Sequence, residues 1–190
     1  MRFHLAEPDD SPEVKAVLAE LAEAGPVSDL QRALANSPGA ARAYVAMSRY
    51  IRLGGGLENE LRELVILRVQ QHLLGEYEWR RHVVSALRVG VTEDQVRALQ
   101  HWSSSQLFSP RQQASLALTD ASVTRHGLAA AMAAVGRDFD WAETVELCML
   151  IGFYSLGAAL ILPFDLIDGD SAEPAPLAMF ADGSNERPAV

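Results

Sequence analysis

Apolar residues recur every three or four positions along most of the chain, and this spacing predicts helices. The first helix is expected at Pro12, behind the cap Ser11, and stops before Gly25-Pro26. Further helices are expected over residues 28–36, about 40–53, 57–74, 76–89, 92–102, 110–126, 128–135 and 140–163. Alternating strand patterns are almost absent, so the chain is expected to be all-α, as an orthogonal or up-down helical bundle.

The helix boundaries also suggest how the chain is divided. Its 190 residues suit one domain. We expect a helical N-terminal extension over residues 1–38, a main domain over 39–168 and a flexible C-terminal tail over 169–190. The tail is expected to be flexible because it carries Pro174, Pro176 and Pro188 together with Gly183.

The last long helix contains 18 residues without a formal charge, Leu147 to Phe164, which is long enough to raise the question of a membrane. Its flanks are acidic, with Glu143 and Glu146 before it and Asp165 after it, and no Lys or Arg anchors either end. We therefore expect a buried core or subunit-contact helix rather than a membrane span.

Charge and cysteine content narrow the function classes. The net charge is −9, which repels phosphate backbones and argues against a nucleic-acid partner. Cys148 is the only cysteine, so the chain has no internal disulfide, and we expect it to be an inert buried thiol. The first residues lack a basic region followed by an apolar run, so a cytoplasmic location is expected.

Candidate chemistry is concentrated between residues 61 and 90. Glu78 and His82 are four residues apart on one expected helix, so they share a face, and a carboxylate there can orient the imidazole. Glu63 lies on the preceding, strongly apolar helix. Spacing alone also fits an ordinary surface pair. HxxxH, HExxH and paired-carboxylate signatures are absent, so no metal site is predicted.

The same stretch resembles the carboxymuconolactone decarboxylase family, within the AhpD-like superfamily of small all-helical oligomers. The similarity rests on Gly56-Leu57, Arg62-Glu63-Leu64, Ile66-Leu67-Arg68, Tyr77-Glu78-Trp79, His82 and Gly90-Val91-Thr92. Weaker similarity extends it to about residues 40–167. The resemblance implies an AhpD-like helical bundle that assembles as a homo-oligomer, a trimer or hexamer.

The resemblance also separates acid-base chemistry from sulfur chemistry. Peroxidase members of the superfamily carry a glutamate, then a CxxC pair, then a histidine four residues after the second cysteine. By spacing, Glu63 and His82 fall on the glutamate and the histidine, whereas Gly75 and Glu78 fall on the two cysteines. Peroxidase or disulfide chemistry through a CxxC pair is therefore excluded, since no thiolate exists there.

What the resemblance implies is a cofactor-free, decarboxylase-like lyase whose substrate is a small carboxylated lactone or β-keto acid. His82 would deliver a proton as the general acid, Glu78 would orient it and Glu63 would relay or accept a proton.

The expected substrate-binding residues surround these three. Tyr77 and Trp79 would exclude water, and Arg68 or Arg81 would hold the substrate carboxylate by bidentate hydrogen bonds. Two alternatives stay open: an isomerase or lactone hydrolase that uses the same Glu/His pair, and a non-catalytic oligomeric binding or scaffold protein of the same fold.

Overall fold

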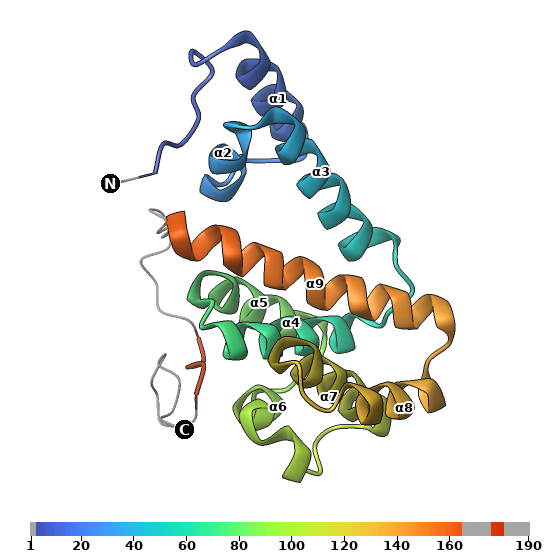
Figure 1. Cartoon of the computed structure of the whole chain (residues 1–190). Helices are drawn as coiled ribbons and strands as arrows, with labels where there is room; N and C mark the ends of the chain where they lie inside the picture. Colours follow the sequence, from blue (N-terminus) through green and yellow to red (C-terminus); the bar gives the residue numbers. More distant parts are fainter. Residues whose placement is uncertain (1–2, 165–175, 181–190) are drawn as a thin grey trace.

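The computed structural model describes residues 3–164 and 176–180, and helices fill most of them (Figure 1). In chain order they are α1 (Pro12–Ala22), α2 (Asp29–Ala35), α3 (Pro38–Arg49), the short π-helix η1 (Tyr50–Gly54), α4 (Asn59–Leu73), α5 (Glu76–Val89), α6 (Glu93–Ala98), the 3₁₀ helix η2 (Leu99–Ser104), α7 (Pro110–Thr124), α8 (Leu128–Asp138) and α9 (Trp141–Phe164). No strand occurs in these two described ranges, so the all-α prediction is confirmed.

Local side-chain chemistry sets several helix ends. Thr92 and Gln95 form a capping box at the start of α6, in which each side chain bonds the other residue's backbone N–H. Between α4 and α5 the sequence suggested a break at Gly75. The left-handed residue there is Leu74, with a φ of 56°, and Gly75 is the residue that precedes α5.

Helix α4 lies at the centre of the bundle and contacts α5, α7 and α9. It is apolar over most of its circumference, and eight of its residues are buried. One core cluster joins α4 to α7 and α9, and a second joins the opposite side of α4 to α5 and η2. Residues on α4 are therefore held by packing on several sides, which makes this helix a rigid support for a site.

The first three helices form a separate layer at one end of the molecule, above α9 in Figure 1. Their own apolar cluster contains Val17, Leu21 and Leu34, and Ile161 from the last turns of α9 joins it. The start of α3 at Pro38 coincides with the domain boundary expected at residue 38, but that division remains a prediction.

The C-terminal segment 176–180 differs from the flexible tail expected after residue 169. Leu177, Met179 and Phe180 are buried in the second core cluster. The indole N–H of Trp79 donates to the carbonyl of Leu177 at 2.9 Å, and the Gln71 amide donates to the carbonyl of Met179 at 2.7 Å. This part of the tail is packed because its apolar side chains fill the surface of α4 and α5. The rest of the predicted tail, 169–175 and 181–190, lies outside the described residues.

Helix α9 has one buried and one exposed apolar side. By length and composition it is the one helix in the described residues that could cross a membrane, and 44% of its most apolar window is buried inside the molecule. Cys148 lies on the exposed side, which corrects the expectation of a buried thiol. Because α9 packs on α4 along only one side, its other apolar side stays exposed within the described part of the chain.

Candidate active site

The seam between α4 and α5 brings three predicted residues together. Glu63 comes from α4, and Glu78 and His82 come from α5, one helical turn apart. Nδ1 of His82 lies 2.7 Å from Oε2 of Glu63, and Nε2 lies 3.3 Å from Oε2 of Glu78. The imidazole is therefore held between two carboxylates. Glu63 makes the shorter contact and is the main orienting group, a role that sequence spacing had given to Glu78.

These three side chains are largely removed from water. The exposed fraction is 13% for Glu63 and His82 and 11% for Glu78. Burial on its own lowers the pKa of His82, but hydrogen bonding and attraction to Glu63 and Glu78 outweigh it and raise the pKa to about 9. The imidazole is consequently a cation at neutral pH, held between the side chains of Glu63 and Glu78.

Aromatic side chains from α9 and α3 lie beside His82. The ring of Tyr154 stands edge-on to His82, with centroids 5.0 Å apart, and Phe153 connects it to Tyr44 through ring contacts of 5.4 and 4.7 Å. No hydrogen bond joins the hydroxyl of Tyr44 or Tyr154 to another described residue. Burial, followed by the negative charge of Glu78, raises the pKa of both phenols. Both hydroxyls therefore stay protonated and can donate.

Sequence reasoning missed Tyr44 and Tyr154 because both lie far along the chain from Glu63 and His82. A buried tyrosine within an apolar helix is an ordinary core residue by composition. Only the packing of α9 and α3 against the α4–α5 seam places these two phenols beside the acidic cluster.

The predicted aromatic wall on α5 is only partly formed. Trp79 is fully buried in the second core cluster, and its indole N–H is bonded to Leu177. It therefore anchors the C-terminal segment. Tyr77 packs against the N-terminal layer, and the guanidinium of Arg81 lies 5.5 Å from the centre of its ring. Arg81 itself is exposed.

Arg68 is placed in a different cluster. Its guanidinium binds both carboxylate oxygens of Asp120, at 2.6 and 3.0 Å, and His72 and Trp102 contact the same carboxylate at 2.7 and 3.0 Å. Partial burial raises the pKa of Asp120, but the contacts from His72 and Arg68 outweigh it and lower it to about 2. The arrangement braces α4 against α7 and η2, and no contact connects Arg68 with His82 in the described residues.

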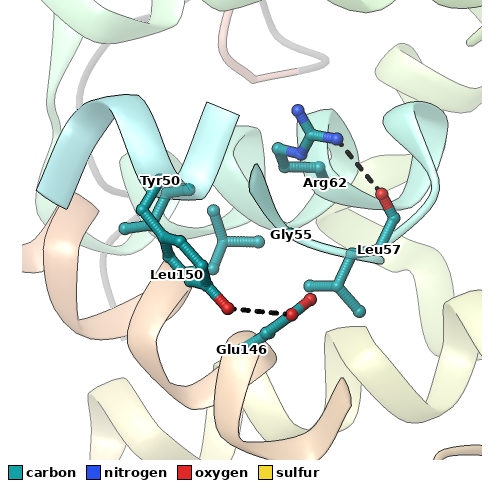
Figure 2. Close-up of a pocket in the computed structure, with 7 residues that line it drawn as sticks. Tyr50, Gly55, Leu57, Arg62, Glu146 and Leu150 are labelled. Atoms are coloured by element: carbon teal, nitrogen blue, oxygen red, sulfur yellow. Dashed lines mark hydrogen bonds between the residues drawn. The ribbon is translucent and has the colours of Figure 1, made fainter. Parts of the chain in front are cut away.

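A small recess beside η1 is separate from the seam. Glu146 of α9 accepts a hydrogen bond from the Tyr50 hydroxyl at 3.1 Å (Figure 2). It accepts a second one from the Gly56 N–H at 2.7 Å. The space has a volume of about 10 Å³, which is room for about one water molecule. The hydrogen bonds of Glu146 therefore connect the glycine-rich loop to α9. The space beside them is too small for a substrate.

Metal binding has no support in the side-chain geometry. Within residues 3–164 and 176–180, no group of three or more His, Cys, Asp or Glu side chains is arranged to hold an ion. Glu63, Glu78 and His82 are instead arranged as donors and acceptors for one another. What this arrangement can do is hold and move a proton next to an aromatic wall.

Residues 38–121 match the model of the carboxymuconolactone decarboxylase family. The match covers less than half of the 190 residues and shows a similarity to this family. The matched segment runs from the start of α3 into α7 and includes Glu63, Glu78 and His82. A comparison with curated proteins gave no match.

Several solved structures share the fold of this chain at low sequence identity. A variant of the debrominase Bmp8 in complex with 2,3,4-tribromopyrrole has a TM-score of 0.73 and 15% identity, covering 90% of this chain and 92% of the other. A protein of unknown function from Agrobacterium tumefaciens, named as a putative antioxidant defence protein AhpD, gives 0.65 and 21%, covering 70% and 92%. An uncharacterized peroxidase-related protein from Silicibacter sp. TM1040 gives 0.71 and 14%, covering 90% and 91%. These similarities establish an AhpD-like fold.

The chain has no thiol at the α4–α5 seam, since its one cysteine, Cys148, lies on α9. By the spacing given above, Gly75 and Glu78 occupy the positions of the two peroxidase cysteines. Glu78 places a carboxylate against His82, and Gly75 leaves space that the Gln70 side chain fills. The α4–α5 seam therefore brings one imidazole and two carboxylates together without a thiol beside them.

Proposed function

We propose that the protein is a cofactor-free lyase that decarboxylates a small carboxylated lactone or β-keto acid. The observation that carries this proposal is the imidazole of His82, held between two carboxylates and largely shielded from water. The match of residues 38–121 to the model of the carboxymuconolactone decarboxylase family supports the reaction class. The substrate is a small molecule, and no nucleic acid or membrane partner is proposed.

Decarboxylation requires a group that accepts the electron pair of the broken bond and a group that donates a proton. When the carbon–carbon bond to the carboxylate breaks, carbon dioxide leaves and the electron pair moves into the conjugated carbonyl, forming an enolate. The Tyr154 hydroxyl, with Tyr44 beside it, would donate a hydrogen bond to the enolate oxygen and stabilise the developing charge. Protonation at carbon then completes the reaction.

His82 is the proposed proton donor. Its raised pKa keeps it charged at neutral pH, and Nε2 has the longer of its two carboxylate contacts. Nε2 would therefore turn to the substrate while Glu63 keeps hold of Nδ1. Glu78 would return a proton from solvent to the imidazole after each turnover.

A direct test measures carbon dioxide released from carboxymuconolactone and from a set of β-keto acids. His82→Gln should slow release by about 10²–10⁴-fold if His82 is the acid. His126→Gln is a matched control, since His126 is exposed between α7 and α8 and its loss should leave the rate unchanged. Equal rates for wild type and His82→Gln would remove His82 from this role.

The same experiment separates the alternatives. Run in deuterated water and followed by NMR, an isomerase would place deuterium on carbon without releasing carbon dioxide, and a lactone hydrolase would open the ring. A non-catalytic scaffold would do none of these. Absence of carbon dioxide from every compound with the wild-type protein would refute the lyase.

We also propose that the protein forms a homo-oligomer, a trimer or hexamer, in the cytoplasm. Support comes from an apolar stripe on the exposed side of α9, made by Trp141, Val145, Met149 and Leu156, whose exposed fractions range from 83% for Trp141 to 37% for Met149. Their spacing of three to four residues, with Gly152 between, puts them on one helix face. A contiguous exposed apolar face is typical of a protein interface.

A further inference from the structure

Helix α9 contains a buried glycine at the point where the N-terminal layer meets the candidate site. Gly157 follows Tyr154 by three residues and precedes Ile161 by four, so the three share one face of the helix. Tyr154 contacts the ring of His82, and Ile161 belongs to the apolar cluster of the first three helices. Gly157 therefore lies between the seam and the layer that covers this end of α9.

The hydroxyl of Tyr44 occupies the space that a side chain at position 157 would need. A Cβ atom built on Gly157 would lie 3.3 Å from this oxygen. No other described atom lies within 4 Å of it, once the adjoining backbone of α9 is left out. At that distance the phenol would have to move by a few tenths of an ångström. The missing Cβ at position 157 is therefore what lets Tyr44 keep its position.

A glycine inside a helix is unfavourable unless a contact requires it, because it loses more backbone freedom on folding than alanine does. Gly157 lies within the 24-residue helix α9, away from both ends. Its φ is not positive, so alanine could adopt its backbone conformation. Gly136 of α8 shows the other case, since a Cβ atom there would meet nothing within 4 Å. The close approach of Tyr44 is what distinguishes position 157.

The position of the Tyr44 phenol matters because α3 carries it to the aromatic residues beside His82. Its ring contacts Phe153 at a centroid distance of 4.7 Å, and Phe153 contacts Tyr154 at 5.4 Å. Burial and then the negative charge of Glu78 raise the pKa of Tyr44, so its hydroxyl lies within electrostatic reach of the seam. The N-terminal layer thus supplies one of the two phenols near the imidazole.

We propose that Gly157 is a positioning residue, which admits the Tyr44 hydroxyl to the place where it donates a hydrogen bond to the enolate oxygen. The inference rests on the proposed function. It makes the N-terminal layer part of the active site, and it makes position 157 the point that sets where the donor of that layer lies. A side chain at position 157 would push the hydroxyl away from α9, and such donors act only within about 2.7–3.1 Å of the oxygen they stabilise.

A double-mutant cycle tests the contact between residues 44 and 157. Gly136→Ala is the control, and it should raise the unfolding midpoint by about 2–4 °C, since alanine favours a helix. Gly157→Ala should give no such rise, because its methyl group meets the hydroxyl of Tyr44. In the Tyr44→Phe background, which lacks this hydroxyl, Gly157→Ala should raise the midpoint by about 2–4 °C. Equal shifts in the two backgrounds would overturn the inference.

Fluorine NMR reports the position of the phenol without turnover. The protein is labelled with 3-fluorotyrosine, and the signals of its four tyrosines are assigned from Tyr→Phe variants. Gly157→Ala should move the Tyr44 signal. The Tyr50 signal should stay, because Tyr50 binds Glu146, about three turns away along α9. Gly136→Ala should move neither signal. An unmoved Tyr44 signal in Gly157→Ala would overturn the inference.

Carbon dioxide release measures the consequence for the reaction. Tyr44→Phe should slow turnover by about 10²-fold, and Gly157→Ala by about three- to tenfold, because a slightly displaced donor loses part of its effect. Both kcat and kcat/KM should fall together, since the bond is made in the transition state. Gly136→Ala should turn over like wild type.

The combined variant separates the two proposals. Gly157→Ala should slow the Tyr44→Phe protein no further, since the hydroxyl through which it acts is already gone. Turnover by wild type with the same loss from Gly157→Ala in both backgrounds would refute only the positioning role. Absence of carbon dioxide with wild type would refute the lyase, whereas the unfolding midpoints and fluorine spectra would still decide whether Gly157 sets the position of the hydroxyl.

Discussion

Replacing Glu63 with glutamine should make the stability of the protein depend on pH in a defined way. Glu63 holds Nδ1 of His82 at 2.7 Å and favours its charged form. Glutamine can still accept that hydrogen bond through its amide oxygen, but it carries no charge. The substitution therefore removes most of the electrostatic part of the contact while preserving the size of the side chain.

The magnitude follows from the pKa of His82. A rise from 6.5 to about 9 corresponds to about 3 kcal/mol of stabilisation. Two carboxylates share this effect, and Glu63 makes the shorter contact, so Glu63→Gln should lose about 1–2 kcal/mol. Because the pKa is raised in the folded protein, the stabilisation is fully present below pH 6.5. It is lost as the pH rises through 9.

Urea unfolding at pH 6, 8 and 10 measures this prediction. The difference between wild type and Glu63→Gln should be largest at pH 6 and close to zero at pH 10. NMR titration of His82 should show its pKa falling in the variant. Glu93→Gln is the control, since Glu93 pairs with Arg97 on an exposed helix face and should leave stability unchanged. A difference that is the same at all three pH values would refute the reasoning.

Three further predictions address other parts of the molecule. Tyr154→Phe should preserve the fold and slow carbon dioxide release by about 10²-fold, because it removes one donor to the enolate; unchanged kinetics would contradict this. Asp120→Asn should lower the free energy of unfolding by about 2 kcal/mol at pH 7. Because the pKa of Asp120 is lowered in the folded state, the difference from wild type in urea unfolding should shrink as the pH falls from 3.8 towards 2. Trp141→Glu should dissociate the oligomer in light scattering, and a wild-type protein that is already a monomer would rule out the interface on α9.

The helices were predictable because their signals are local. Ser11 with Pro12 begins α1, and Thr92 with Gln95 forms the capping box of α6. Each of these depends on residues within one turn, where backbone geometry leaves few alternatives. The apolar character of α4 likewise indicated a helix surrounded by others.

The site was predictable only in part. Spacing joins Glu78 to His82 on one helix, but the addition of Glu63 depended on the family resemblance, because no local rule fixes which face of α4 meets α5. The partner of Arg68 lies on α7, and the wall residue Tyr154 lies on α9. Contacts between segments so far apart depend on the whole packing arrangement, which a single sequence does not specify by its periodicity.

The C-terminal segment illustrates a different limit. The sequence predicted a flexible tail from residue 169, and composition does not reveal that Leu177 and Met179 are buried in a core cluster with residues of α4 and α5. Two backbone carbonyls there accept bonds from Trp79 and Gln71. Short apolar segments within a polar tail should therefore be examined for packing against the folded core.

The contact between Gly75 and Gln70 makes these two positions depend on each other. A Cβ atom at position 75 would overlap the amide oxygen of Gln70 in its present rotamer. A larger residue at position 75 therefore requires the Gln70 side chain to move or to be replaced, and the effect of a substitution at position 75 should differ between glutamine and a smaller residue at position 70.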